Sequence, residues 1–253
     1  MMRAPVLALA AALALAGAAS ASAAEAVKMP KQSWSFSGVF GTFDRAQLQR
    51  GLTVYKNVCS ACHAMEHLYY RNLTEIGLTE EQVKEIAAQY EVTDGPNDEG
   101  EMFQRPARPS DRFRRPFPNE NAARASNNGA YPVDLSLIVK ARDDGANYVY
   151  ALLTGYADPP PDMKMADGMN YNKVFPGHQI AMAAPISEGV VEYEDGTAAS
   201  VEQVAKDVTA FLAWAAEPEL EERKRLGVKV ILFLLVLTGM LYAVKRKVWA
   251  DVH

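Results

Sequence analysis

The only two cysteines of the chain stand three positions apart and are followed at once by a histidine, in Cys59-Ser60-Ala61-Cys62-His63. A C-x-x-C-H run is the attachment pattern of c-type haem. Two thiols at this spacing reach the two vinyl groups of one porphyrin, and the adjacent imidazole of His63 is then held beneath the iron as a ligand. Because the motif occurs once, the residues predict one haem c, covalently attached through Cys59 and Cys62.

Three other uses of the cysteine pair fit the sequence less well. A thioredoxin-like C-x-x-C needs a βαβ setting, which the surrounding pattern does not offer. A zinc site needs four ligands, and the chain has no second cysteine pair. A simple disulfide beside a chance histidine is the third alternative.

The ligand on the other face of the iron decides between functions. A methionine thioether raises the reduction potential and favours electron transfer, whereas an open position permits ligand binding or peroxidase-type chemistry. The candidates are Met29, Met65, Met102, Met163, Met165, Met169, Met182, His67 and His178. Met65 and His67 are too close to His63 along the chain to reach the opposite face. Spacing alone leaves open Met163, Met165, Met169 and Met182.

Helices are expected on both sides of the motif, and strand signals are sparse. Asp44 followed by Gln47 predicts a helix start, and apolar residues recur at helical spacing from there to the motif. Further helices are predicted after Thr79, over 134–142, over 146–153, and after Ser200 until Pro218 interrupts the pattern. The residues therefore predict a mainly α fold.

Two stretches rich in proline and glycine predict long loops. Residues 91–119 are acidic in their first half and basic in their second, and they predict a surface excursion rather than regular structure. Residues 156–185 are rich in proline, glycine and methionine. A loop of that length in a compact domain is usually functional or disordered, and lying over a haem face would order it.

The N-terminal segment predicts export. Residues 1–24 combine Arg3, an alanine- and leucine-rich run, and Ala21-Ser22-Ala23, which is typical of a cleaved signal peptide. An uncleaved transmembrane helix is the alternative, but the run is short and rich in alanine. Residues 25–225 are then the exported haem domain.

The C-terminal segment predicts a membrane anchor. Residues 226–244 form an apolar run that spans about 28 Å as a helix, close to the hydrocarbon thickness of a bilayer. Basic residues flank both ends of the run, so the signal peptide rather than the charge bias sets its orientation. Residues 245–253 are therefore expected to form a short cytoplasmic tail.

The charge of the chain favours a basic protein partner. The formal net charge is −5, and the exported part is more acidic than the whole chain because several basic residues lie in the anchor and the tail. Such a surface discourages nucleic acid binding.

Several stretches together resemble the cytochrome c1 family, the haem-bearing subunits of cytochrome bc1 complexes. They are VCSACHAM, DGPNDEGEMFQRP, ARASNNGAYPVDLSLIVKAR, YVYALLTGY, FPGHQIAMAAP, and VAKDVTAFLAWAAEPE followed by RKRLGVK. The resemblance covers nearly all of the mature chain. It implies a class I cytochrome c-like haem domain with long loop insertions, plus one C-terminal transmembrane helix. The signal peptide favours a bacterial version, in which the haem domain lies on the periplasmic side of the inner membrane.

The resemblance also implies roles for individual residues. The axial methionine of the family lies in the stretch that matches residues 179–182, which singles out Met182. Arg142 matches a basic contact to a haem propionate, and the residues that match haem-lining positions are Asn127, Pro132 and Tyr148. The acidic residues expected to attract a basic soluble cytochrome c are Asp94, Asp98, Glu99 and Glu101. Some bacterial members brace the haem loop with a disulfide, which this chain has no cysteines to form.

The function implied by the resemblance is electron transfer rather than bond chemistry by this chain. The Rieske iron–sulfur protein would deliver an electron to the haem, and a soluble cytochrome c would receive it. The chain would lie beside cytochrome b in the lipid bilayer, within a dimeric quinol–cytochrome c oxidoreductase. The alternatives are a membrane-tethered haem enzyme, such as a peroxidase, and an anchored electron shuttle that works alone.

Overall fold

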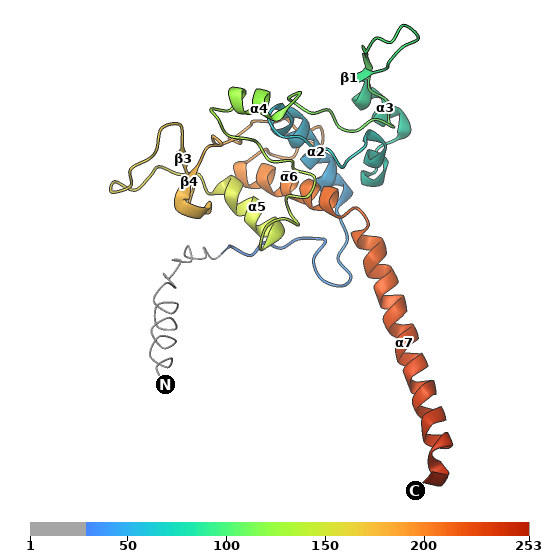
Figure 1. Cartoon of the computed structure of the whole chain (residues 1–253). Helices are drawn as coiled ribbons and strands as arrows, with labels where there is room; N and C mark the ends of the chain where they lie inside the picture. The colour runs from blue at the N-terminus through green and yellow to red at the C-terminus, as the bar shows by residue number, and fades with distance from the viewer. Residues whose placement is uncertain (1–28, 253) are drawn as a thin grey trace, which may run out of the picture.

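The computed structural model describes residues 29–252, so the predicted signal peptide lies outside the described residues. The described chain is mainly helical, as predicted (Figure 1). The α-helices are α2 (Arg45–Asn57), α3 (Glu80–Ala88), α4 (Glu120–Ser126), α5 (Gly145–Thr154), α6 (Val201–Ala216) and α7 (Leu220–Val248). The 3-10 turns are η1 (Cys59–Ala61), η2 (Tyr70–Ile76), η3 (Pro176–His178) and η4 (Ala250–Val252). The strands are β1 (Glu91–Asp94), β2 (Phe103–Pro106), β3 (Asn170–Tyr171) and β4 (Gln179–Ile180).

Helices α2 and α6 form the centre of the domain and make its most extensive contact between elements. They approach closely at Gly51, where a Cβ atom would lie 2.2 Å from the carbonyl oxygen of Asp207 and 2.6 Å from Cβ of Phe211. No side chain larger than hydrogen fits at that crossing. Helix α5 packs against the same helix α6 (Figure 1), so the three helices share one core.

A buried polar cluster joins α2 to α6 within this core. The carboxylate of Asp207 is fully buried and accepts hydrogen bonds from Arg50 Nε at 2.9 Å, Gln47 Nε2 at 3.1 Å and Gln203 Nε2 at 2.8 Å. Arg50 also pairs with Asp195 at 2.8 Å. A buried carboxylate costs free energy unless it is paired and hydrogen-bonded, and Asp207 is both.

The predicted helix starts are confirmed, because each capping side chain is bonded as the sequence pattern requires. Asp44 accepts from the backbone N–H of Gln47 at 3.2 Å, and Thr79 accepts from that of Gln82 at 3.2 Å. In the first turn of α6, the hydroxyl of Ser200 accepts from the backbone N–H of Gln203 at 3.2 Å. These bonds satisfy N–H groups that have no partner within the helix.

The prediction of a helix over 134–142 is wrong, because the segment is a series of turns. Its polar side chains form hydrogen bonds with backbone N–H groups, both within the segment and in a part of the chain that is distant in sequence. The Asp134 carboxylate accepts from the N–H of Ser136 at 2.8 Å, and the Ser136 hydroxyl accepts from the N–H of His67 at 3.0 Å. Such local bonds compete with helix formation.

The prediction that 91–119 lacks regular structure is also wrong. Strands β1 and β2 pair antiparallel as a hairpin, with Glu91 opposite Pro106 and Asp94 opposite Phe103. Polar cross-strand contacts hold it, including a 2.7 Å hydrogen bond from Gln104 to Thr93. An exposed polar hairpin carries no apolar alternation, which is why the sequence pattern did not indicate it.

Helix α7 leaves the domain as a single extended rod (Figure 1). Among the described residues it is the one helix long and apolar enough to cross a membrane, and none of its most apolar window is buried in the protein. Pro218 lies between α6 and α7, where the sequence predicted an interruption.

Candidate functional site

The C-x-x-C-H motif is a single tight turn at the end of α2. The N–H groups of Cys62 and His63 both donate to the carbonyl oxygen of Cys59, at 3.1 Å and 2.9 Å. The turn keeps the two cysteines within one turn of backbone of each other. Cys59 is half-buried, Cys62 is exposed, and neither is in a disulfide. Burial raises the pKa of the Cys59 thiol to about 12, and the Cys62 thiol adds to the rise.

A hydrogen bond sets the tautomer of the His63 imidazole. Its Nδ1 lies 2.7 Å from the carbonyl oxygen of Val133. A carbonyl oxygen only accepts, so Nδ1 carries the proton and Nε2 presents its lone pair. Burial lowers the pKa of His63, although the bond to Val133 opposes the shift, so burial favours the neutral ring that can bind a metal.

Residues 133–136 run beside the motif and form hydrogen bonds with the residues that directly follow it. The N–H of Leu135 donates to the carbonyl oxygen of Ala64 at 2.9 Å, and the N–H of Glu66 donates to the Asp134 carboxylate at 2.8 Å. The turn segment that replaced the predicted helix therefore fixes the position of the histidine.

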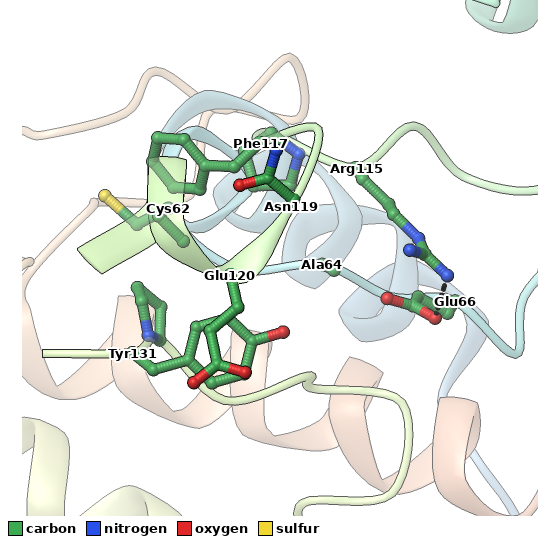
Figure 2. A pocket seen from close by; sticks show the side chains of 11 residues that line it. Cys62, Ala64, Glu66, Arg115, Phe117, Asn119, Glu120 and Tyr131 are labelled. Atoms are coloured by element: carbon green, nitrogen blue, oxygen red, sulfur yellow. Dashed lines mark hydrogen bonds and ion pairs between the residues drawn. The ribbon is translucent and has the colours of Figure 1, made fainter. Parts of the chain in front are cut away.

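A hollow opens beside Cys62 (Figure 2). Cys62 lies at one end, and an ion pair between Arg115 and Glu66, 2.6 Å long, lies at the other. Between them the lining mixes Phe117 and Tyr131 with the polar side chains of Asn119 and Glu120.

Met182, the predicted second ligand, is half-buried and lies just after β4. Strand β4 pairs with β3, and the hydroxyl of Tyr156 donates to the carbonyl oxygen of Met182 at 3.1 Å. Burial raises the pKa of Tyr156, which keeps this donor protonated. Met65, excluded by its spacing, is fully buried in the core. Burial does not separate Met182 from the other open candidates, since all are half-buried: Met163, Met165 and Met169.

The structure places the other predicted haem residues on three different elements. Asn127 ends α4, where its side-chain amide donates to the carbonyl oxygen of Ala123 at 2.7 Å. Tyr148 is half-buried in α5 and packs against the core. Arg142 is exposed, and within residues 29–252 it donates only to the neighbouring carbonyl oxygen of Ala141, at 3.0 Å, so its guanidinium has further donors for an anion.

The predicted acidic docking residues belong to the β1–β2 hairpin, and they differ in whether the carboxylate forms an ion pair. Asp94 forms an ion pair with Arg105, and this bond lowers the pKa of the carboxyl. Its charge is therefore partly neutralised within the hairpin. The other three carboxylates are exposed around the tip and have no ion pair in the described structure: Asp98, Glu99 and Glu101.

Sequence reasoning missed three positioning groups: the carbonyl of Val133, the carboxylate of Asp134 and the hydroxyl of Tyr156. A backbone carbonyl leaves no mark in the sequence. The Asp134-x-Ser136 spacing is typical of a side-chain turn, and this signal was available. Its partner at Glu66 was not, because the two residues meet only in the folded chain.

A mainly helical domain in which helix α2 runs into a C-x-x-C-H turn, with a histidine whose neutral ring presents Nε2 to a metal, belongs to the class of c-type cytochromes. Comparison of the sequence with known proteins identifies a particular family within this class. The family described as "Cytochrome C1 family" matches residues 34–252. The chain belongs to the cytochrome c1 family of haem proteins.

Bacterial and mitochondrial relatives support this assignment. "Cytochrome c1" of Rhodospirillum rubrum is 48% identical over 242 residues, with 89% of each chain covered. "Cytochrome c1-2, heme protein, mitochondrial" of Solanum tuberosum is 53% identical over 208 residues, covering 82% of this chain and 80% of the relative. "Cytochrome b/c1" of Bradyrhizobium diazoefficiens is 49% identical over 248 residues, and the match covers 36% of that longer protein.

Proposed function

We propose that this chain is the electron-transfer subunit of a quinol–cytochrome c oxidoreductase, the bc1 complex. The observation that carries the proposal is the tight turn at Cys59–His63, which brings the two cysteines together with an imidazole whose Nδ1 is held by the carbonyl oxygen of Val133. Membership of the cytochrome c1 family supports the particular complex. When bound, the haem supplies one-electron chemistry, since its iron alternates between the ferrous and ferric states.

The residues proposed to hold the haem divide by task. Cys59 and Cys62 attach it by thioether bonds, His63 binds the iron through Nε2, and Met182 binds it through sulfur. Arg142 offsets the charge of a propionate. The residues proposed to line the macrocycle are Asn127, Pro132 and Tyr148.

Without a disulfide, hydrogen bonds are proposed to brace the segment that bears Met182. Tyr156 holds the Met182 carbonyl directly. Asn172 is fully buried, donates to the carbonyl oxygen of Leu152 at 2.8 Å and accepts from the N–H of Val174 at 2.9 Å. The loop is therefore tied to the end of α5 at two places, and these bonds are proposed to replace the disulfide that braces the loop in some bacterial members.

The proposed place of the chain in the membrane follows from its layout. Residues 1–24 would be removed on export, and residues 25–225 would lie on the periplasmic side of the bacterial inner membrane. Residues 226–244 would cross the lipid bilayer beside cytochrome b, with 245–253 in the cytoplasm. The name "Cytochrome b/c1" of the Bradyrhizobium relative supports cytochrome b as a partner.

The proposed electron path begins at the Rieske iron–sulfur protein and ends at a soluble cytochrome c, within a dimeric complex. A basic acceptor would be drawn by the exposed carboxylates at the tip of the hairpin. Charges on such a surface raise the rate of encounter more than the affinity. No nucleic acid partner is proposed.

The decisive experiment is mild detergent extraction of the membrane, followed by identification of the proteins that co-purify. We expect cytochrome b and a Rieske protein, and a haem stain on the denatured chain. Recovery of the haem-stained chain alone would favour an independent anchored shuttle. A vacant sixth position in the ferric spectrum would favour a haem enzyme, and the loss of all haem stain on denaturation would exclude covalent attachment.

A further inference from the structure

The loop that precedes α2 exposes apolar side chains at its tip. Residues 32–43 contain no charged residue. Val39 is 62% exposed and Phe40 is 84% exposed, although the aromatic residues at the base of the loop pack together. A phenylalanine this exposed, beside a valine, forms a small apolar projection that water solvates poorly.

Backbone contacts keep the projection in shape. The N–H of Ser37 donates to the carbonyl oxygen of Trp34 at 3.0 Å, and the N–H of Thr42 donates to that of Ser35 at 3.1 Å. A Cβ at Gly41 would lie 2.0 Å from the carbonyl oxygen of Ser37, so the turn needs glycine there. Because the turn is fixed, Phe40 does not fold back onto the domain.

The loop is attached to the first turns of α7. The ammonium group of Lys224 donates to two loop carbonyl oxygens, those of Phe36 at 2.6 Å and Gly41 at 3.1 Å. The N–H of Phe43 donates to the Glu221 carboxylate at 2.8 Å. Lys224 precedes the apolar run of α7 by two residues, which is about 3 Å along a helix axis. The loop therefore lies level with the point where the apolar run begins.

The loop also projects on the side of the domain from which α7 leaves (Figure 1). If α7 crosses a membrane, the tip meets the lipid headgroups and the ends of the acyl chains. Aromatic side chains are favoured at that depth, and uncharged apolar projections are stable in it. The exposed guanidinium of Arg225 in the adjoining helix turn suits the phosphate groups of the lipids.

We propose that Val39 and Phe40 insert into the periplasmic face of the bilayer that α7 crosses, as a second, shallow contact with lipid. The contact limits the tilt of the haem domain on the membrane, because it adds a second point of attachment beside the one that α7 supplies. The inference rests on the proposed membrane placement of α7, and it adds a lipid-binding surface that is separate from the haem site.

The test uses single cysteines labelled with the fluorophore bimane in the full haem-loaded chain, held in phosphatidylcholine nanodiscs. The two natural cysteines are consumed by the haem, so an introduced thiol is labelled alone. The variants are Phe40→Cys at the tip, Leu235→Cys on α7, and Asp98→Cys at the hairpin tip. Each is quenched by lipid that carries a nitroxide near the top of its acyl chain, and by aqueous iodide.

We expect lipid nitroxide to quench the label at Phe40 at least half as strongly as the label at Leu235, with iodide quenching well below that at Asp98. Quenching at Phe40 that matches Asp98, while Leu235 remains in lipid, would overturn the loop proposal alone. Protection from both quenchers would overturn it too, because protein rather than lipid would then cover the tip. Water-like quenching at Leu235 would instead refute the membrane placement of α7. Val39→Cys repeats the measurement at a second position.

Discussion

Replacement of Gly51 by alanine tests whether the crossing of α2 and α6 supports the domain. The added Cβ would lie 2.2 Å from the carbonyl oxygen of Asp207 and 2.6 Å from Cβ of Phe211. Neither neighbour is the end of a flexible side chain, so the two helices must separate. Overpacking of a well-packed core costs roughly 1–3 kcal/mol, and the upper end applies at this contact.

The higher helix propensity of alanine offsets about 1 kcal/mol of that cost. The expected net loss is about 2 kcal/mol, which corresponds to a drop of about 4–8 °C in the unfolding midpoint of a domain of this size. The assay is thermal unfolding of the haem-loaded chain in detergent, followed through the absorbance of the haem. Circular dichroism at room temperature checks that the variant has folded.

The matched control is Gly227→Ala in α7, where a Cβ would meet no atom within 4 Å. The same chemical change should leave the midpoint unchanged or slightly raised. An unchanged midpoint for Gly51→Ala, with the haem spectrum intact, would refute the reasoning, since it would mean that the helices separate without cost.

Three further predictions concern the proposed haem site and its partner. Met182→Leu should lower the reduction potential and allow carbon monoxide to bind the ferrous iron, whereas Met169→Leu should do neither; an unchanged potential without ligand binding would exclude Met182. Tyr156→Phe removes a hydrogen bond worth about 0.5–1.5 kcal/mol and should speed cyanide binding to the ferric iron by up to about tenfold, as measured by stopped flow; an unchanged rate would show that Tyr156 does not brace the ligand. Neutralising the hairpin-tip carboxylates Asp98, Glu99 and Glu101 should slow the reduction of a basic cytochrome c several-fold at low salt and little at high salt. The same change at Glu192, Glu194 and Glu202 should slow the reduction less. Equal rates at low salt for the hairpin variant and the unchanged protein would exclude the hairpin from docking.

The loop proposed to cross the haem face was predictable from the sequence in part. Its composition predicted a long loop over 156–185, either functional or disordered, and the assignment of Met182 came from family resemblance. Spacing alone left four methionines open. The hydrogen bond from Tyr156 and the buried Asn172 explain how the segment is held, and both depend on neighbours distant in sequence.

The sequence by itself determined the motif, the helix caps and the apolar C-terminal run. Each depends on residues within about one or two helical turns, where covalent geometry and local hydrogen bonding decide the outcome. The caps at Asp44, Thr79 and Ser200 formed as predicted for that reason.

Tertiary structure alone decided what surrounds those local features. The turns at 134–142 replaced a predicted helix because Asp134 and Ser136 bond to the chain beside the histidine. Polar cross-strand contacts formed the hairpin, and the tautomer of His63 was set by a carbonyl 70 positions away. Contacts between distant residues form only when the chain is compact, so no local pattern encodes them.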